Sequence, residues 1–276
     1  MNLEEKHENL ISILRNLGSV AIGFSGGVDS TFLLKVAKDT LGDQVLAVTA
    51  RSSTYPEREF LEAKEYANKL NAKHEVIISE ELDIEGFSKN PIDRCYHCKN
   101  ELFSKIQAVA EEQGYKYVLD GSNLDDVGDY RPGMKAAKEL GVRSPLKEAK
   151  MTKEDIRTLS EKLKLPTWNK PAFACLSSRF PYGNEITKEK LSMVEKAEEY
   201  LRSLGIIQTR VRHHENIARI EVDPKERKKF FDENLMDEVG KTLKNYGFTY
   251  VTLDISGYRS GSMNEVLSEE EKNISK

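Results

Sequence analysis

The sequence lacks any apolar run that approaches the ~20 residues a membrane helix needs. Its first residues, MNLEEKHENLISILRNL, alternate charged and apolar side chains at helical spacing. They also lack the continuous apolar segment of a secretory signal peptide. We therefore expect a cytoplasmic protein with no membrane partner.

The sequence also lacks a strong excess of either charge. It has 42 Lys and Arg against 46 Asp and Glu, a net charge of −4 over 276 residues. Proteins that coat nucleic acid nonspecifically carry a strong basic field. The balance therefore argues against a nucleic-acid partner, although it leaves room for a local basic site.

Cysteine is scarce, with only Cys95, Cys98 and Cys175 in the chain. A small odd number argues against a disulfide framework and turns attention to thiol chemistry or metal ligation. Cys95 and Cys98 form a CxxC pair, a pattern found in redox and zinc sites and also without function. Structural zinc normally takes four protein ligands, and His97 is available as a fourth. Basic neighbours favour the thiolate form: Arg94, Lys99 and Arg179.

Apolar periodicity predicts strands that alternate with helices of ten or more residues in the first part of the chain. The expected strands are 19–24, 45–50, 74–79 and 115–121, and the expected helices are 31–41, 56–71 and 99–113, with a loop and a short helical turn over 80–94. This alternation is typical of an α/β fold with a parallel sheet, and right-handed crossovers place helices on both faces.

The pattern changes after about Lys170. We expect a linker or site loop over 169–185, then a helix over 187–205 with Thr187 as its cap and Gly205 as its end. Strands over 208–214, 218–222 and 249–255 and a helical stretch over 224–246 complete a smaller α+β unit. The sequence thus predicts two domains, 1–170 and 171–276, the second holding the linker and a unit for substrate binding or oligomerisation.

The stretch 23-GFSGGVDSTF-32 lies between a predicted strand and a predicted helix. Small residues at such a turn expose backbone N–H groups at a helix N-terminus, which suits phosphate. The candidate phosphate residues are Ser25, Gly26, Gly27, Asp29 and Ser30. The charge of Asp29 repels phosphate unless Mg²⁺ bridges them. An ordinary capped turn is the alternative interpretation.

The motif SGGVDS resembles the SGGxDS signature of the PP-loop ATP pyrophosphatases and fits neither GxxxxGK nor GxGxxG. The resemblance implies MgATP cleavage between the α and β phosphates, adenylation of a substrate oxygen, and displacement of AMP by nitrogen or sulfur. It also implies an adenine site at the loop that begins at Ala50.

Three further stretches support the resemblance. In 120-DGSNLDD-126, Ser122 and Asp125 follow a strand, at the sheet edge where ligands bind. Asp125 and Asp126 are candidate metal ligands or, alternatively, helix caps. Arg131 lies in 129-DYRPG-133, and 143-RSPLKE-148 resembles the Ser-Pro-Leu element of the superfamily.

Nearly the whole chain resembles the LarE sulfur transferases of nickel-pincer cofactor biosynthesis. The similar stretches are SGGVDS, DGSNLDDVGDYRPG, WNKPAFACLSSRFPYG, RVRHHENIARIEV and YVTLDISGYRSGSMN. The resemblance implies an enzyme that adenylates carboxylates of pyridinium-3,5-biscarboxylic acid mononucleotide and converts them to thiocarboxylates. It further implies a homo-oligomer, a sulfide donor and contact with other enzymes of the pathway.

Arginine and glutamate side chains near the second domain fit such a substrate. Arg179, Arg210 and Arg212 offer forked donors for phosphate, and Arg210 and Arg212 share one face of a predicted strand. Glu221 on the next strand is positioned to pair with an arginine or bind Mg²⁺. The alternative for this set is a charged solvent face.

The resemblance includes two ways of supplying sulfur. In one, a cysteine gives up its own sulfur; that cysteine falls one position earlier, where this chain has Ala174. In the other, three cysteines hold a 4Fe–4S cluster, which Cys95, Cys98 and Cys175 match. The sequence therefore favours the cluster, with zinc and sacrifice of Cys175 as the alternatives.

Three other functions remain open from the sequence. A tRNA 2-thiolation enzyme shares the PP-loop and three-cysteine cluster, and retention of tRNA at moderate salt distinguishes it. An ammonia-using ligase of the NAD-synthetase type needs no thiols. A nucleotide-binding scaffold would release no pyrophosphate.

Overall fold

The computed structural model describes residues 1–127, 132–259 and 261–268, and its contacts group into two units. The first unit contains Met1–Glu81 and Asp93–Phe173. The second contains Leu82–Ile92 and the described residues from Ala174 onward. The domain boundaries expected from the sequence stay a prediction. No helix in the described part of the chain is long and apolar enough to cross a bilayer.

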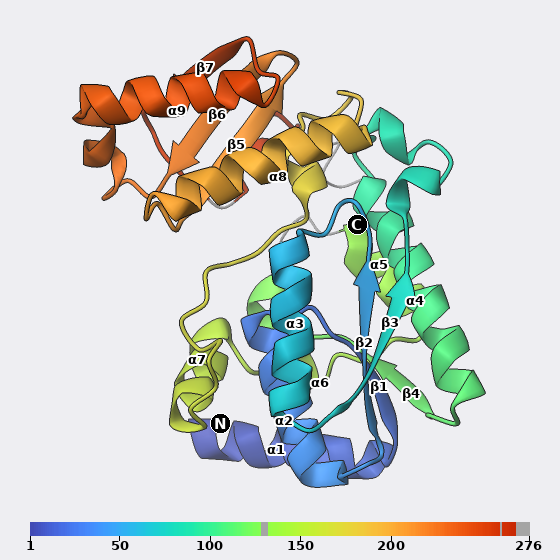
Figure 1. The fold of residues 1–276 in the computed structure, drawn as a ribbon. Helices are drawn as coiled ribbons and strands as arrows, with labels where there is room; N and C mark the ends of the chain where they lie inside the picture. The colour runs from blue at the N-terminus through green and yellow to red at the C-terminus, as the bar shows by residue number, and fades with distance from the viewer. Residues whose placement is uncertain (128–131, 260, 269–276) are drawn as a thin grey trace. The chain divides into compact units, whose positions relative to one another are not determined.

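The first unit is built on a four-stranded parallel sheet with the order β3-β2-β1-β4 (Figure 1). Its strands are β1 (Val20–Gly23), β2 (Val45–Arg51), β3 (Lys73–Ile78) and β4 (Tyr117–Leu119). Because strand side chains alternate between faces, Val20 and Ile22 enter one apolar cluster while Ala21 enters the other. The α/β class with a parallel sheet is thus confirmed.

Helices cover both faces of this sheet. One cluster joins β1 and β2 to residues of α1, α2, α3, α6 and α7, and the other joins them to α4 and α5. The helices are α1 (Leu3–Leu17), α2 (Val28–Leu41), α3 (Glu57–Lys69), α4 (Arg94–Glu112), α5 (Pro132–Glu139), α6 (Pro145–Glu148) and α7 (Lys153–Lys162). All four strands point their carboxyl ends toward one edge, where their following loops gather.

The second unit pairs a small mixed sheet with two helices. Its strands are β5 (Thr209–His214), β6 (Ile217–Val222) and β7 (Tyr250–Leu253), with β5 and β6 antiparallel and β6 and β7 parallel. Its helices are α8 (Lys188–Ser203) and α9 (Glu233–Asn245). The hydroxyl of Thr187 caps α8 by accepting the Lys190 N–H, which confirms the predicted start. The smaller C-terminal α+β unit is confirmed.

Several elements differ from the sequence prediction: α5 and α6 were not predicted, and α9 begins at Glu233 and not near Pro224. Helix α4 begins at Arg94 and not at Lys99, so the CxxC pair lies in its first turn. Apolar periodicity missed this turn because it is stabilised from outside: a Cβ on Gly133 of α5 would lie 3.2 Å from the Cys95 carbonyl oxygen. Helix α7 was not predicted, although its capping box of Thr152 and Asp155 is a sequence signal.

Candidate functional site

The turn between β1 and α2 presents bare backbone N–H groups. Gly27 is the N-cap of α2, and within the described residues no side chain caps this end. The Ser30 hydroxyl accepts the Ser25 N–H at 3.3 Å and lies 3.2 Å from the Ser25 hydroxyl, which closes the turn. The first amides of a helix carry partial positive charge. The turn therefore offers an anion site.

Gly26 is required by its surroundings. Its φ is +62°, a left-handed conformation, and a Cβ built there would lie 2.9 Å from the Cα of Ala63 in α3. Any side chain would be strained by the backbone and would strike a neighbouring helix. The glycine thus allows α3 to pack directly against the turn.

The loops after β2 and β4 meet the turn at the carboxyl edge of the sheet. The Thr49 hydroxyl donates to the Phe24 carbonyl at 2.8 Å, one residue before Ala50. A Cβ on Gly121 would lie 3.2 Å from the Ser30 nitrogen, so the chain just before Ser122 passes close to the start of α2. The structure therefore brings the candidate residues of three loops to one edge, as the sequence predicts for a parallel sheet.

Asp29 has partners that the sequence did not reveal. Its carboxylate pairs with the ammonium of Lys153 and accepts a hydrogen bond from Asn123 Nδ2 at 3.3 Å. A lysine 124 residues away therefore offsets the charge that disfavours an anion here. The sequence signal that could have identified Lys153 is its position directly after Thr152, the capping residue of α7.

Asp125 and Asp126 act as caps in the structure. Asp125 accepts the Lys153 N–H at 2.8 Å, and Asp126 accepts the Asn123 N–H at 2.9 Å. Among the described residues, no three His, Cys, Asp or Glu side chains gather as a metal site. Arg131 lies outside the described residues.

Lys170 is a functional candidate that the sequence analysis missed. Its buried ammonium lies 2.7 Å from Glu59 Oε2 and 2.6 Å from Glu62 Oε2, and it donates to the Gly26 carbonyl at 3.2 Å. Although burial opposes ionisation, Lys170 and Arg58 hold the pKa of Glu62 below its ordinary value. No local sequence pattern marks Lys170, because its partners are distant along the chain. Glu62 is 108 residues away and Gly26 is 144 residues away.

Two of the cysteines lie in the first turn of α4, in the first unit. Cys95 and Cys98 are three residues apart, so they share one face of the helix. Arg94 Nη2 lies 4.0 Å from Cys95 Sγ, and the Cys98 thiol lies 3.7 Å from Glu81 Oε1. Burial raises the pKa of Glu81. His97, between the two thiols in sequence, pairs with Asp93 at 3.3 Å.

The third cysteine lies in the second unit. Cys175 precedes a short 3-10 helix, Leu176–Arg179, and is half-buried. Arg179 is fully buried, holds Glu198 through two 2.8 Å hydrogen bonds, and donates to the carbonyls of Ala174 and Cys175 at 2.6 and 3.0 Å. The guanidinium thus fixes the backbone that carries the Cys175 thiol.

Arg210, Arg212 and Glu221 form a buried charged group in the second unit. Their exposed fractions are 4%, 5% and 0%, so the alternative of a solvated surface is wrong. Arg212 donates to Glu221 at 2.7 Å, and Arg219 donates to the other oxygen of Glu221 at 3.0 Å. Burial, with the charge of Arg179, lowers the pKa of Arg210 to about 10. A guanidinium with a depressed pKa is one that an added anion would stabilise.

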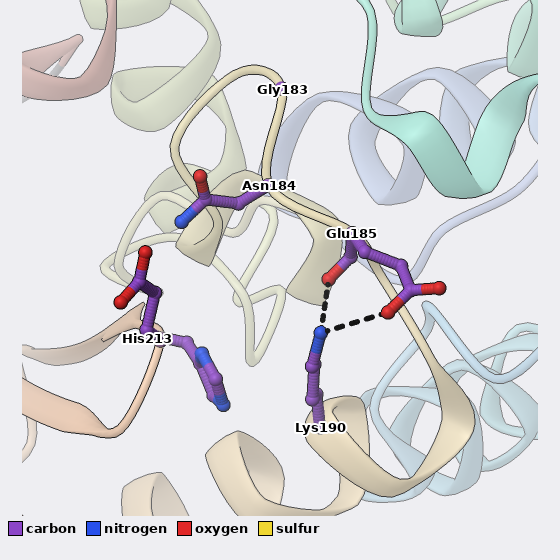
Figure 2. Close-up of a pocket in the computed structure, with 6 residues that line it drawn as sticks. Gly183, Asn184, Glu185, Lys190 and His213 are labelled. Carbon is purple, nitrogen blue, oxygen red and sulfur yellow. Dashed lines mark hydrogen bonds and ion pairs between the residues drawn. The ribbon is translucent and has the colours of Figure 1, made fainter.

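A small cavity of about 240 Å³ lies in the second unit (Figure 2). None of the residues that line it was a site candidate in the sequence. Lys190 crosses it to Glu185 at 3.2 Å, and the His213 ring faces the same space. The lining residues are Gly183, Asn184, Glu185, Lys190, His213 and Glu215. Its mixed charges offer no preference for a ligand of one sign.

The sequence profile of the NAD synthase family matches residues 8–104, which run from α1 through the glycine turn into α4. Together with the parallel sheet and the uncapped turn after β1, this match defines the first unit as a PP-loop ATP pyrophosphatase domain.

Relatives of similar length extend the comparison to both units. An uncharacterized protein of Synechocystis is 48% identical over 96% of this chain and 99% of its own. The pyridinium-3,5-bisthiocarboxylic acid mononucleotide synthase of Lactiplantibacillus plantarum is 42% identical over 96% of both chains. An uncharacterized protein of Methanocaldococcus jannaschii is 32% identical over 94% of this chain and 95% of its own. The chain belongs to the LarE family, the family of that synthase.

Proposed function

We propose that this chain is an ATP-dependent sulfurtransferase that acts on pyridinium-3,5-biscarboxylic acid mononucleotide. It adenylates a carboxylate of this substrate, releases pyrophosphate, and exchanges AMP for sulfur to give a thiocarboxylate. The observation that carries the proposal is the uncapped glycine turn at the start of α2, in a chain 42% identical to a synthase of the bisthiocarboxylic product.

In this proposal the turn holds the phosphates of MgATP. The amides of Gly26 and Gly27 and the hydroxyls of Ser25 and Ser30 donate to phosphate oxygens. Asp29, which contacts Asn123 and Lys153, would be the carboxylate that holds Mg²⁺. Asp125 and Arg131 belong to the same site by family resemblance, and the loops at Ala50 and Ser122 receive the nucleoside.

The buried charges of the second unit bind the substrate nucleotide. Arg210 and Arg212 donate to its phosphate, and Glu221 orients Arg212 through their 2.7 Å hydrogen bond. Arg179 positions the Cys175 backbone through its hydrogen bonds to Ala174 and Cys175. The low pKa of Arg210 supports this role, because a phosphate dianion would replace the hydration that burial removes.

The three thiols fit a 4Fe–4S cluster in donor chemistry. Among the described residues none of the three forms a disulfide, and Cys95 and Cys98 are spaced to reach one metal group from one helix face. By family resemblance Cys175 would be the third ligand. When bound, such a cluster supplies an exchangeable sulfide. Cys95, Cys98 and Cys175 would hold it through their sulfur atoms, and Arg94 Nη2 lies 4.0 Å from the Cys95 sulfur.

Anaerobic iron and sulfide analysis tests this function. After reconstitution we expect a brown wild-type protein with visible absorbance and about four irons per chain, whereas Cys95→Ala should lose most of both. Ser104→Ala, an exposed change on the same helix, is the matched control. Pyrophosphate release should require the biscarboxylic substrate. A colourless protein that loses one sulfur per turnover would contradict the cluster, and an unchanged reaction after replacing all three cysteines would contradict sulfur transfer.

A further inference from the structure

Two successive carbonyl groups of the glycine turn are held by side chains from distant parts of the first unit. The Tyr55 hydroxyl donates to the Ser25 carbonyl at 2.7 Å. The Lys170 ammonium donates to the next carbonyl, that of Gly26, at 3.2 Å. Neither residue belongs to the motif that identifies the turn.

Because the peptide group is planar, these two carbonyl contacts also orient the N–H groups of the next residues. In a trans peptide the C=O of one residue and the N–H of the next point in opposite directions. Tyr55 therefore directs the N–H of Gly26 away from itself, and Lys170 does the same for the N–H of Gly27. The Gly27 amide belongs to the N-cap of the uncapped helix α2, and the Gly26 amide directly precedes it in the turn.

Lys170 is held by the protein on several sides. Its ammonium donates to Glu62 and to the Gly26 carbonyl, and it forms a 2.7 Å ion pair with Glu59 Oε2. Arg58 pairs with the same two glutamates at 2.6 and 2.7 Å, so two positive charges balance two negative ones. The charge of Lys170 is therefore balanced within the protein, and its contact with the turn is structural in kind.

Tyr55 is likewise fixed as a donor. Burial, with the charges of Glu59 and Glu62, raises the pKa of its hydroxyl, so it stays protonated. Its ring packs edge-on against Phe173 with the centroids 5.5 Å apart. This ring contact restrains the side chain whose hydroxyl donates to Ser25.

We propose that Tyr55 and Lys170 are positioning residues that aim the Gly26 and Gly27 amides at the phosphates of ATP. They act through the two peptide groups and do not touch the nucleotide. The inference rests on the proposed function, because it deepens the assignment of the ATP site. The proposal predicts that Tyr55 and Lys170 strengthen binding of the β and γ phosphates more than binding of the α phosphate.

Binding of α,β-methylene-ATP and of AMP, measured by calorimetry, tests the proposal. Tyr55→Phe removes only the hydroxyl and keeps the ring against Phe173, and Lys170→Met removes the ammonium. We expect each to weaken α,β-methylene-ATP binding at least tenfold and to change AMP binding less than threefold. Lys170→Arg keeps a positive charge with several N–H donors, so it should recover part of the lost affinity.

Lys6→Met is the matched control. Lys6 makes a half-buried ion pair with Asp155 at 2.5 Å in the same unit but does not contact the turn. It should leave both affinities unchanged. Equal weakening of both ligands in Tyr55→Phe, or wild-type affinity in both Tyr55→Phe and Lys170→Met, would overturn the positioning role. Wild-type protein that does not bind α,β-methylene-ATP at all would overturn the proposed function instead.

Discussion

At the scale of single residues, the glycine turn depends on backbone freedom and close approach acting together. Gly26 needs both, because its φ is positive and Ala63 leaves no room for a Cβ. Gly114, after α4, has a φ of +75° and open space around it. The two glycines therefore separate the cost of a left-handed backbone from the cost of a steric clash.

We expect Gly114→Ala to lower the free energy of unfolding by about 1 kcal/mol, the cost of the left-handed conformation alone. Gly26→Ala should lower it further and also weaken ATP binding at least tenfold, because the clash with Ala63 displaces the turn. Urea unfolding and nucleotide titration measure the two effects. Gly26→Ala protein that binds ATP like the wild type would show that the turn is not the phosphate site.

At the scale of elements, strand β5 buries a histidine between two aromatic rings. The His213 ring is 5.1 Å from Phe180 and 5.4 Å from Phe248, and the residue is 2% exposed. Burial, with the charges of Lys190 and His214, lowers its pKa from 6.5 to about 4. Glu185 and Glu215 line the same cavity and complete the charged groups around it.

The depressed pKa of His213 predicts acid sensitivity. The folded state resists protonation, so its stabilising contribution is complete above about pH 6.5 and is lost as the pH falls from there through 4. We expect at most about 3 kcal/mol from this residue. His213→Phe, which keeps the stacking, should show a flatter decline in unfolding free energy over that range. Equal slopes for the two proteins would contradict this assignment.

At the scale of the whole molecule, the chain contributes Leu82–Ile92 to the second unit and then returns to the first. Asn90 anchors this excursion. It is fully buried with φ +55°, its side-chain amide donates to the carbonyls of Phe180 and Pro181 at 3.2 and 2.6 Å, and its backbone carbonyl accepts the Gly183 N–H at 2.9 Å. One side chain thus links the excursion to the loop after Arg179.

We expect Asn90→Ala to lower the unfolding free energy by about 3 kcal/mol, from lost buried hydrogen bonds and a left-handed alanine. Asn71→Ala is the control, because Asn71 is exposed with φ +49° and should cost only about 1 kcal/mol. Chemical unfolding of both variants measures the difference. If the two losses were equal, the buried contacts of Asn90 would contribute nothing.

Much of the fold followed from local patterns. Alternating strands and helices predicted the parallel sheet, and the cap at Thr187 predicted the start of α8. The first turn of α4 was missed because packing against α5, and not its own periodicity, stabilises it. The candidate phosphate residues Ser25 to Ser30 were also visible in the sequence, since adjacent residues form the turn.

The sequence by itself determined the alternation of strands and helices, the glycine turn and the family, because each depends on neighbouring residues or on similarity along the whole chain. Only the tertiary structure decided which charges meet: Lys153 with Asp29, and Lys170 with Glu59 and Glu62. Buried ions need partners wherever folding brings them, and partners more than a hundred residues apart leave no local pattern. For that reason the residues that aim the turn appear only in the folded chain.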